Sequence, residues 1–256
     1  EIWLKETEAG RERILTRHPV RSFVKTSGTT GEPKLLPVTD PWAKVVAEGQ
    51  LLWTMGMVKE QEAVAWGKAL TTLGQPVEGH AANGVPYGSN TGRMGAAQPW
   101  LVRNRWAIPP DVASLTEPDV RHYAWLRMAL SARVTSWTTA NPSMILALCR
   151  RLQEWRKYLE VDLKEGSLSQ GPGSLVPADL VKRWRPWLKR REIPTDWSPV
   201  GLWNLAAVNC WTGGPAQYFV ERLPHALGGS VTVRDVGITA SEGYFAIPLH
   251  SSWRGG

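Results

Sequence analysis

The chain has 256 residues, of which 43% are apolar and 21% are charged. This balance is typical of one large or two small globular domains, and it excludes disorder for most of the chain. No run reaches the roughly 20 apolar residues that a membrane-spanning helix needs, so we expect no membrane partner. Thirty Lys and Arg against 23 Asp and Glu give a net charge of +7. This mild excess suits a polyanionic ligand such as a nucleotide but does not by itself indicate nucleic-acid binding.

Cysteine and tryptophan usage narrow the class further. The two cysteines, Cys149 and Cys210, are far apart, form no CxxC pair and have no histidine at metal-ligand spacing. We therefore predict a reducing, cytoplasmic setting without structural zinc. Fifteen of the aromatic residues are Trp. We expect most of them to fill core volume or line surfaces, and a few to wall an apolar substrate pocket.

The first half of the chain is predicted to alternate strands with helices. Residues 1–14 look like the end of a charged helix already under way, so we expect the chain to lack the start of its fold. Asp40 and Pro41 supply an N-cap and a proline at the first helical position. A loop rich in Gly and Asn, residues 79–95, separates two later strands. In chain order we expect a strand at residues 22–25, a loop at 26–34, a helix opened by Asp40, and strands at 63–70 and 106–108.

The second half continues this alternation. Asn141 and Pro142 cap a helix, and a tight Gly-Gly-Pro turn precedes a later one. In chain order we expect a helix at residues 116–131, a strand at 133–137, helices at 141–158 and 177–191, a buried strand at 202–211, a turn at 213–215 with a helix to 226, and strands at 231–236 and 244–249. Strands that alternate with helices predict an α/β architecture with a mostly parallel sheet flanked by helices.

The loop after the first strand has the composition of a phosphate cradle. It reads TSGTTGEPK over residues 26–34. Small residues let backbone N–H groups converge on an anion, hydroxyls add donors, and the Lys adds a mobile positive charge. Because Pro33 precedes the Lys, this is not a Walker A loop, and the alternative is an ordinary hydrophilic turn. The residues that carry the predicted cradle are Ser27, Gly28, Thr29, Thr30, Gly31 and Lys34.

Two further loops follow predicted strands, where open α/β sheets present ligands. In the later loop, Glu242 beside Ser241 suits Mg²⁺, which takes one or two carboxylates plus phosphate oxygens and waters. The alternative for this loop is a solvated turn or a helix cap. The earlier loop contains Gly213, Gly214 and Pro215 between a buried strand and a helix, and its alternative is a tight connection without a ligand.

Together these loops resemble the signature of the adenylate-forming superfamily. The resemblance is closer to the plant auxin-responsive acyl acid amido synthetases (the Gretchen Hagen family) and their bacterial relatives. The segments that carry it are TSGTTGEPKLLP at residues 26–37, TGGPAQYF at 212–219 and ASEGYFAIPL at 240–249. The resemblance implies the large N-terminal domain of an adenylate-forming enzyme, with residues 1–256 as a partial nucleotide- and acyl-binding large domain. It also implies that the family's C-terminal small domain lies outside this chain.

The resemblance gives each motif residue a role. It implies that the cradle residues, including Lys34, hold the phosphates of ATP and that the Gly-Gly-Pro turn lies beside the nucleotide. Ile238 stands where superfamily members often have a Tyr, and it would pack on adenine without ring stacking. Ser241 is implied to contact phosphate and Glu242 to bind Mg²⁺. The family's catalytic Lys belongs to the C-terminal domain, so no catalytic residue is assigned in this chain.

The implied activity is an ATP-dependent ligation of a small carboxylic acid to an amine. The carboxylate attacks the α-phosphorus of ATP, giving an acyl-adenylate and pyrophosphate, and an amine, such as that of an amino acid, then displaces AMP. A donor-rich loop, a Lys and a Glu that binds Mg²⁺ suit this chemistry, which depends on positioning and charge neutralisation. Trp137, Trp100 and Tyr87 are loose candidates for an apolar acyl pocket. We also expect residues 26–34 and 240–242 to lie at the same edge of one sheet, facing a common nucleotide.

Three alternatives stay open at the level of the sequence. An acyl-CoA ligase shares the loop motif, and a non-catalytic remnant would retain only nucleotide binding. A nucleic-acid-binding module would use residues 182–191, which mix cations with Trp. A solvated helix face with its Trp anchored inward explains the same pattern, and we expect no nucleic-acid partner.

Overall fold

The computed structural model describes residues 2–11, 13–26 and 33–253, which form an α/β fold. The strands are β1 (Ser22–Lys25), β2 (Leu35–Val38), β3 (Lys68–Thr71), β4 (Gly79–His80), β5 (Pro86–Gly88), β6 (Val134–Thr138), β7 (Ala207–Cys210), β8 (Thr232–Asp235), β9 (Ile238–Ala240) and β10 (Gly243–Ala246). The α-helices are α1 (Ile2–Glu8), α2 (Asp40–Glu60), α3 (Asn90–Ala96), α4 (Trp100–Arg103), α5 (Pro118–Leu130), α6 (Pro142–Glu154), α7 (Arg156–Glu165), α8 (Ala178–Trp184), α9 (Pro199–Leu202), α10 (Gln217–Val220) and α11 (Leu223–Leu227). None of these helices combines the length and the apolar character needed to cross a membrane.

The main sheet is parallel throughout, with the strand order β3-β6-β7-β8. Most of β6 and all of β7 are buried, because helices cover both faces of the sheet. On one face Ala207 of β7 packs with Met57 of α2. On the other face Val208 joins the large hydrophobic cluster that includes α5 and α6. The predicted parallel sheet flanked by helices is therefore confirmed.

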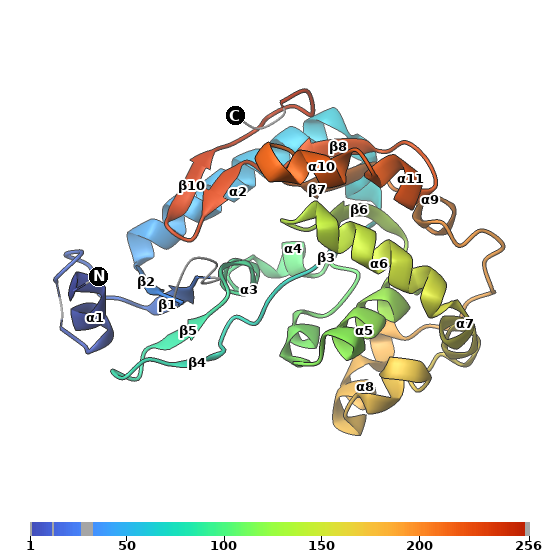
Figure 1. Ribbon diagram of the computed structural model, residues 1–256, viewed down its shortest axis with the longest axis horizontal. Helices are drawn as coiled ribbons and strands as arrows, with labels where there is room; N and C mark the ends of the chain where they lie inside the picture. Colours follow the sequence, from blue (N-terminus) through green and yellow to red (C-terminus); the bar gives the residue numbers. More distant parts are fainter. Residues whose placement is uncertain (1, 12, 27–32, 254–256) are drawn as a thin grey trace.

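A second sheet is mixed and has the order β2-β1-β5-β4. β1 and β2 form an antiparallel hairpin whose register pairs Lys25 with Leu35, and β1 runs parallel to β5. Phe23 and Val24 of β1 are fully buried. β9 and β10 form a separate two-stranded hairpin. Figure 1 shows α2 running from the mixed sheet past this hairpin to the parallel sheet, so α2 connects the parts of the fold that carry the predicted motifs.

The start of α2 differs by one residue from the predicted start. Thr39, not Asp40, is the N-cap, and its hydroxyl accepts a hydrogen bond from the backbone N–H of Trp42 at 3.4 Å. β2 ends at Val38, so Thr39 keeps an extended backbone with φ −115° and ψ 163°. An N-cap residue requires this conformation, and Asp40 and Pro41 therefore become the first helical residues.

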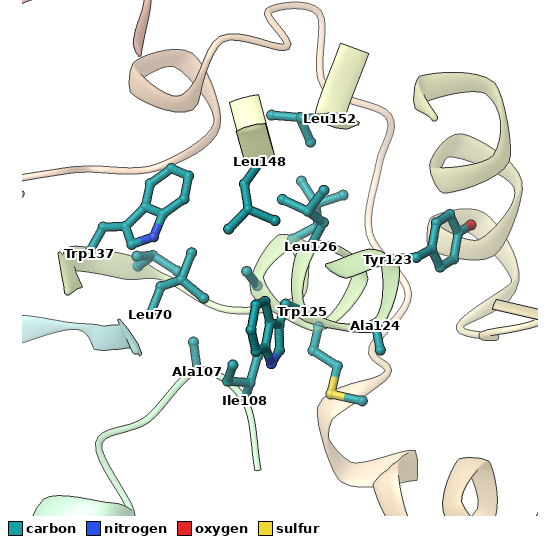
Figure 2. Packing of buried hydrophobic residues seen from close by; sticks show 14 of the residues in the cluster. Leu70, Ala107, Ile108, Tyr123, Ala124, Trp125, Leu126, Trp137, Leu148 and Leu152 are labelled. Atoms are coloured by element: carbon teal, nitrogen blue, oxygen red, sulfur yellow. The ribbon is translucent and has the colours of Figure 1, made fainter. Parts of the chain in front are cut away.

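The hydrophobic core lies between the parallel sheet and helices α5 and α6 (Figure 2). Leu126 of α5, Leu148 of α6 and Trp137 of β6 are each at most 1% exposed. The Trp137 ring meets the Trp203 ring edge to face, with centroids 5.7 Å apart. Burying each large apolar side chain stabilises the fold by about 1.5–3 kcal/mol. This packing fixes the central strands, and therefore the positions at which their loops leave the sheet.

Helices α5 and α6 are confirmed within two residues of their predicted starts at 116 and 141. α5 begins with Pro118, and Asn141 caps α6 by accepting a hydrogen bond from the N–H of Ser143 at 3.0 Å. The predicted end of the second helix near residue 158 is wrong. α6 stops at Glu154, and α7 starts after Trp155, whose backbone is not helical.

Of the two strands predicted at residues 63–70 and 106–108, the first is shortened and the second is absent. Residues 63–70 begin as the 3-10 helix η1 (Glu62–Trp66), and the strand starts at β3. Residues 106–108 are not a strand, because they pair with β3 only through one bridge between Ala69 and Trp106. A single bridge leaves the rest of this short segment free of the ladder that defines a strand.

Three other predicted segments change type or length. The predicted loop at residues 79–95 contains β4, β5 and the start of α3. The predicted helix at residues 177–191 divides into α8 and the 3-10 helix η4 (Arg185–Trp187), since Pro186 lacks the N–H that a continuing helix needs. The predicted strand at residues 202–211 is reduced to β7, and its first residue ends α9.

Candidate functional site

The carboxyl ends of β7 and β8 lie side by side at one edge of the parallel sheet, where α/β folds present ligands. β8 ends at Asp235, which is only 2% exposed. The carboxylate of Asp235 accepts hydrogen bonds from the N–H of Thr212 (2.7 Å), the hydroxyl of Thr212 (2.5 Å) and the N–H of Gly237 (2.6 Å). One buried side chain, which the sequence reasoning missed, therefore fixes both the loop after β7 and the loop after β8.

The loop after β7 carries the predicted Gly-Gly-Pro turn. Gly213 has an extended backbone, and Gly214 and Pro215 begin the 3-10 helix η5 (Gly214–Ala216). Gly214 has φ +54°, which glycine adopts without strain. A Cβ added to Gly214 would meet no atom within 4 Å. The backbone of this turn is therefore open to an approaching ligand.

The loop after β8 turns sharply into the β9–β10 hairpin. Gly237 has φ +93°, and an added Cβ would overlap the carbonyl oxygen of Ala246, so only glycine fits at this position. Ile238 follows as the first residue of β9 and is 45% exposed. Ile238 thus offers an apolar side chain to solvent directly beyond the edge of the parallel sheet.

Ser241 and Glu242 form the turn of this hairpin, because Ala240 pairs with Gly243 across it. The Glu242 carboxylate is exposed and makes no ion pair or hydrogen bond with the part of the chain that the structure describes. Its main-chain oxygen accepts a hydrogen bond from Trp42 Nε1 at 2.6 Å. The turn is therefore held by its backbone while its carboxylate remains available to a cation.

A half-buried cation lies next to the hairpin, and the sequence reasoning also missed it. The Arg93 guanidinium of α3 stacks over the Trp42 ring at 4.4 Å and donates to the side-chain oxygen of Asn90 at 3.2 Å. Asn90 in turn reaches the carbonyl oxygen of Ala240 at 3.5 Å. Burial lowers the pKa of Arg93 from its ordinary value, and the buried Nε has no hydrogen-bond partner among the described residues. Ser89 is the N-cap of α3, and its hydroxyl accepts a hydrogen bond from the Gly92 N–H at 3.0 Å. Because Ser is a preferred N-cap residue, the start of the helix that carries Arg93 could have been predicted from the sequence.

Lys34 lies at the base of the β1–β2 hairpin. The N–H of Thr26 donates to the carbonyl oxygen of Lys34 at 3.0 Å, and the N–H of Lys34 donates to the Thr26 hydroxyl at 2.9 Å. The Lys34 side chain is exposed and forms no ion pair with the described residues. The rest of the predicted cradle, Ser27, Gly28, Thr29, Thr30 and Gly31, lies outside the described residues.

The expectation that residues 26–34 and 240–242 share one sheet edge is wrong. The strands β1 and β2, which flank residues 26–34, belong to the mixed sheet, whereas residues 240–242 belong to the separate β9–β10 hairpin. They are linked instead through α2, since β2 runs into this helix (Figure 1). Trp42 in the first turn of α2 donates to the main-chain oxygen of Glu242 in the hairpin. A helix, not a common ladder of strands, joins the two candidate parts of the site.

The three candidate residues for an acyl pocket do not come together in the described structure. Trp137 is fully buried in the core, and Trp100 on α4 is 67% exposed. Tyr87 of β5 lines a cavity of about 630 Å³, together with Pro33 and Leu35 on either side of Lys34. Of the three candidates, only Tyr87 therefore lies next to the predicted nucleotide loop.

The described structure offers few ligands for a metal ion, and both of its thiols are buried. Among the described residues, no group of three or more His, Cys, Asp or Glu side chains could hold a metal ion. Cys149 and Cys210 are buried and unpaired with each other, and burial raises the pKa of each thiol to about 12. A metal at Glu242 would therefore need phosphate oxygens and waters as its other ligands, which is how Mg²⁺ is commonly held.

The basic segment at residues 182–191 has one of its two Trp side chains, Trp184, turned inward, whereas Trp187 is partly exposed. Trp184 is fully buried and its Nε1 donates to Asp111 at 3.0 Å, and Leu188 is 5% exposed. The neighbouring cations Lys182 and Arg185 are exposed. This arrangement agrees with a solvated helix face whose Trp is anchored in the core.

The fold and the candidate site together indicate the class of protein to which the chain belongs. It is an α/β domain in which a glycine turn and a hairpin with an exposed carboxylate follow the carboxyl ends of two adjacent parallel strands, and the Arg93 guanidinium lies beside that hairpin. Residues 1–232 match the family model described as the GH3 family N-terminal domain, and the chain belongs to this family. No curated protein sequence matches the chain significantly.

Two solved structures share the fold. One is described as GH3.15 acyl acid amido synthetase, with a TM-score of 0.82, 15% identity and coverage of 98% of this chain. The other is described as AtGH3.15 acyl acid amido synthetase in complex with 2,4-DB, with a TM-score of 0.83, 18% identity and coverage of 97% of this chain. The chain spans 46% of the length of each neighbour. At these identities the likeness establishes the fold alone.

Proposed function

We propose that this chain is the partial nucleotide- and acyl-binding large domain of a bacterial-type acyl acid amido synthetase of the adenylate-forming superfamily. The proposed reaction activates a small carboxylic acid with ATP as an acyl-adenylate and then forms an amide with an amino acid or another amine. One observation carries the proposal. The turn after β7 and the hairpin after β8 share the anchor Asp235, and the hairpin also binds Trp42 of α2, directly downstream of Lys34.

The described residues fit the parts of ATP. Lys34 is exposed and unpaired in the described structure, which suits the outer phosphates. The open backbone at Gly214 lets a nucleotide approach closely, and the exposed Ile238 offers an apolar surface to adenine. Ser241 beside them supplies a hydroxyl donor for phosphate. The cradle residues 27–31 complete this proposal as a prediction from the sequence.

Glu242 is the residue that we propose to hold Mg²⁺. Its carboxylate is free, and one carboxylate with phosphate oxygens and waters is a sufficient ligand set for this ion. Bound Mg²⁺ supplies neutralisation of phosphate charge. Arg93, stacked on Trp42 beside the same hairpin, adds a fixed positive charge of this chain's own. Fixed charges in a partly buried site stabilise developing negative charge more strongly than they would in water.

The cavity beside Tyr87 is our candidate for the acid. Pro33, Leu35 and Tyr87 give it an apolar wall next to Lys34, and a structural neighbour is described in complex with the acid 2,4-DB.

The proposal also includes an amine as the second substrate, a cytoplasmic location and the absence of a nucleic-acid partner. The family's catalytic Lys is proposed to come from its C-terminal domain. An assay of acceptors, with amino acids against coenzyme A, separates the amido synthetase from an acyl-CoA ligase.

Calorimetric titration of this chain with Mg·ATP tests the proposal. We expect binding to weaken at least about tenfold in Lys34→Ala, because a charge-assisted hydrogen bond contributes about 1.5–3 kcal/mol and each 1.4 kcal/mol is a factor of about ten. Lys164→Ala is the matched control, since Lys164 is an exposed Lys on α7, outside the proposed site. Absence of Mg·ATP binding, or equal affinity in Lys34→Ala and the control, would remove the basis of the proposal.

A further inference from the structure

A second cavity of about 610 Å³ lies at the opposite end of the parallel sheet, at the amino ends of β3 and β6. Lys68 is the first residue of β3, and Arg133 directly precedes β6. The N–H of Lys68 donates to the carbonyl oxygen of Arg133 at 2.8 Å, which brings the two strand beginnings together. Both residues line the cavity. Of the motif residues proposed to bind ATP, none of those that the structure describes lines it.

Two neighbouring segments add further cations to the same space. The N–H of Ala69 donates to the carbonyl oxygen of Arg105 at 2.8 Å, so the segment of Arg105 runs alongside β3. The N–H of Lys189 donates to the Ser131 hydroxyl at 3.1 Å, which ties the chain after η4 to the end of α5. The cationic residues that line the cavity are Lys68, Arg103, Arg105, Arg133 and Lys189.

These cations have no acidic counterpart. The described lining of the cavity contains no Asp or Glu, and in the part of the chain that the structure describes none of the five cations forms an ion pair. The pKa of Lys68 is lowered, first by burial and then by the charges of Arg105 and Lys189. Lys68, Arg105 and Lys189 are therefore close enough to repel one another. The side chains of Lys68 and Arg105 donate to the main-chain oxygens of Asn104 and Ala65, which leaves their charges without a counter-ion. A cleft lined by one sign of charge concentrates ions of the opposite sign.

The remaining walls are flat and apolar. Trp66, Trp106 and Trp187 line the cavity with Ile108 and Pro109. Trp66 is 67% exposed, so its ring is accessible from solvent. Indole faces and proline rings bind planar rings, and cations bind phosphate groups. A volume of about 610 Å³ falls in the range of small-molecule sites.

We propose that this cavity is a binding site for a condensed phosphate, a linear triphosphate chain carried by inorganic tripolyphosphate or by a nucleoside triphosphate. Five cations without an acid match an anion with several negative charges, and binding such an anion relieves the repulsion of Lys68 by Arg105 and Lys189. The site is independent of the nucleotide site proposed at the carboxyl ends of β7 and β8, and it stands whether or not that function is correct.

Calorimetric titration with inorganic tripolyphosphate in metal-free buffer tests this site. The variant Arg133→Gln with Lys189→Gln removes two exposed cations whose side chains make no hydrogen bond within the described structure. We expect its affinity to fall at least about tenfold at low salt, and the difference to shrink at high salt. Lys157→Gln with Lys164→Gln removes the same charge from exposed positions of α7 and should change the affinity less than about twofold.

The same titration with GTP identifies the source of the triphosphate. If Trp66→Ala weakens GTP binding but not tripolyphosphate binding, the ligand is a nucleotide whose base stacks on Trp66. Equal affinities of Trp66→Ala and the native chain for both probes indicate the inorganic anion. Tripolyphosphate binding that is equal in the two double variants overturns the proposal, as does binding that only Lys34→Ala abolishes. A separate titration of the variant Arg133→Gln with Lys189→Gln with Mg·ATP reports on the proposed nucleotide site. The two proposals can therefore fail independently.

Discussion

At the carboxyl end of the parallel sheet, the buried carboxylate of Asp235 accepts three hydrogen bonds and fixes two loops. At the amino end, five cations surround a cavity that contains no carboxylate among its described lining residues. In the first arrangement the buried carboxylate has its hydrogen-bond donors within the protein. The Glu242 carboxylate in the following hairpin is exposed and has no partner in the described structure. In the second arrangement Lys68 and Arg105 donate to main-chain oxygens, but no acid neutralises the charges, and Lys68, Arg105 and Lys189 repel one another.

This difference separates two ways of making a binding surface. Hydrogen bonds to a buried acid position backbone turns before a ligand arrives, so ligand binding there needs little reorganisation. A group of like charges instead lowers the stability of the free protein and regains that free energy when an anion binds. Removing a charged side chain should therefore have opposite effects on stability at the two ends of the sheet.

The largest expected effect is that of Asp235→Ala at the carboxyl end. The substitution leaves the N–H groups of Thr212 and Gly237 without an acceptor in a buried environment. Each unsatisfied buried donor costs about 1–3 kcal/mol, so we expect the free energy of unfolding to fall by about 2–5 kcal/mol. Urea unfolding measures this, and Asp179→Ala on α8, where the Asp is exposed, is the control. A loss below about 1 kcal/mol would mean that Asp235 is not the anchor of the two loops.

The two glycines at this end should respond unequally to alanine. Gly237→Ala combines a positive φ with an overlap between Cβ and the carbonyl oxygen of Ala246, and we expect it to cost about 2–4 kcal/mol. Gly214→Ala has a positive φ but free space, and we expect about 1 kcal/mol. Thermal unfolding of both variants checks the order. Equal losses would contradict the close approach described at Gly237.

Glu242→Gln should affect the ligand and leave the fold unchanged. The carboxylate is exposed and unpaired in the described structure, so we expect a stability change within about 0.5 kcal/mol. Affinity for Mg·ATP should fall about tenfold, in line with the loss of one charged ligand group. Titration of ATP at several Mg²⁺ concentrations measures this, with Glu221→Gln as an exposed control. If metal-free ATP binding falls by the same factor, Glu242 does not act through the metal.

The smallest expected effect is a gain in stability at the amino end. Lys189→Gln removes one of the charges that lower the pKa of Lys68, and we expect it to stabilise the chain by about 0.2–0.5 kcal/mol at low salt. The gain should vanish at high salt, where exposed charges are screened. Folded Lys68, with its lowered pKa, loses its proton at lower pH than the unfolded chain does. The gain should therefore decline as the pH rises toward about 10.4, the ordinary value for Lys. A destabilised Lys189→Gln would contradict the proposed repulsion.

The sequence predicted best the elements whose signals are local. Asn141 and Pro142 mark the start of α6, and Ser22–Lys25 is the strand that its apolar residues predict. Elements held mainly by tertiary partners were missed. β4 and β5 are two and three residues long and contain Gly and Pro, so their strand character comes from pairing with each other and with β1.

The site was predictable as a set of loops but not as an arrangement. The motif residues stand out because glycine, hydroxyl and charged side chains cluster after strands. Asp235 and Trp42 gave no such signal, because their partners lie 23 and 200 positions away along the chain. Membership of a sheet is also a tertiary property, which is why residues 26–34 and 240–242 were wrongly expected on one sheet.

Hydrogen exchange of the chain with and without Mg·ATP tests most directly the claim that the carboxyl end of the parallel sheet, with the loop at Lys34, binds the nucleotide. Mass spectrometry of peptides reports the protection of each segment separately, without any substitution. We predict slower exchange on adding Mg·ATP in the segments 26–34, 212–217 and 237–244. Unchanged exchange in all three segments at a saturating nucleotide concentration would contradict the claim.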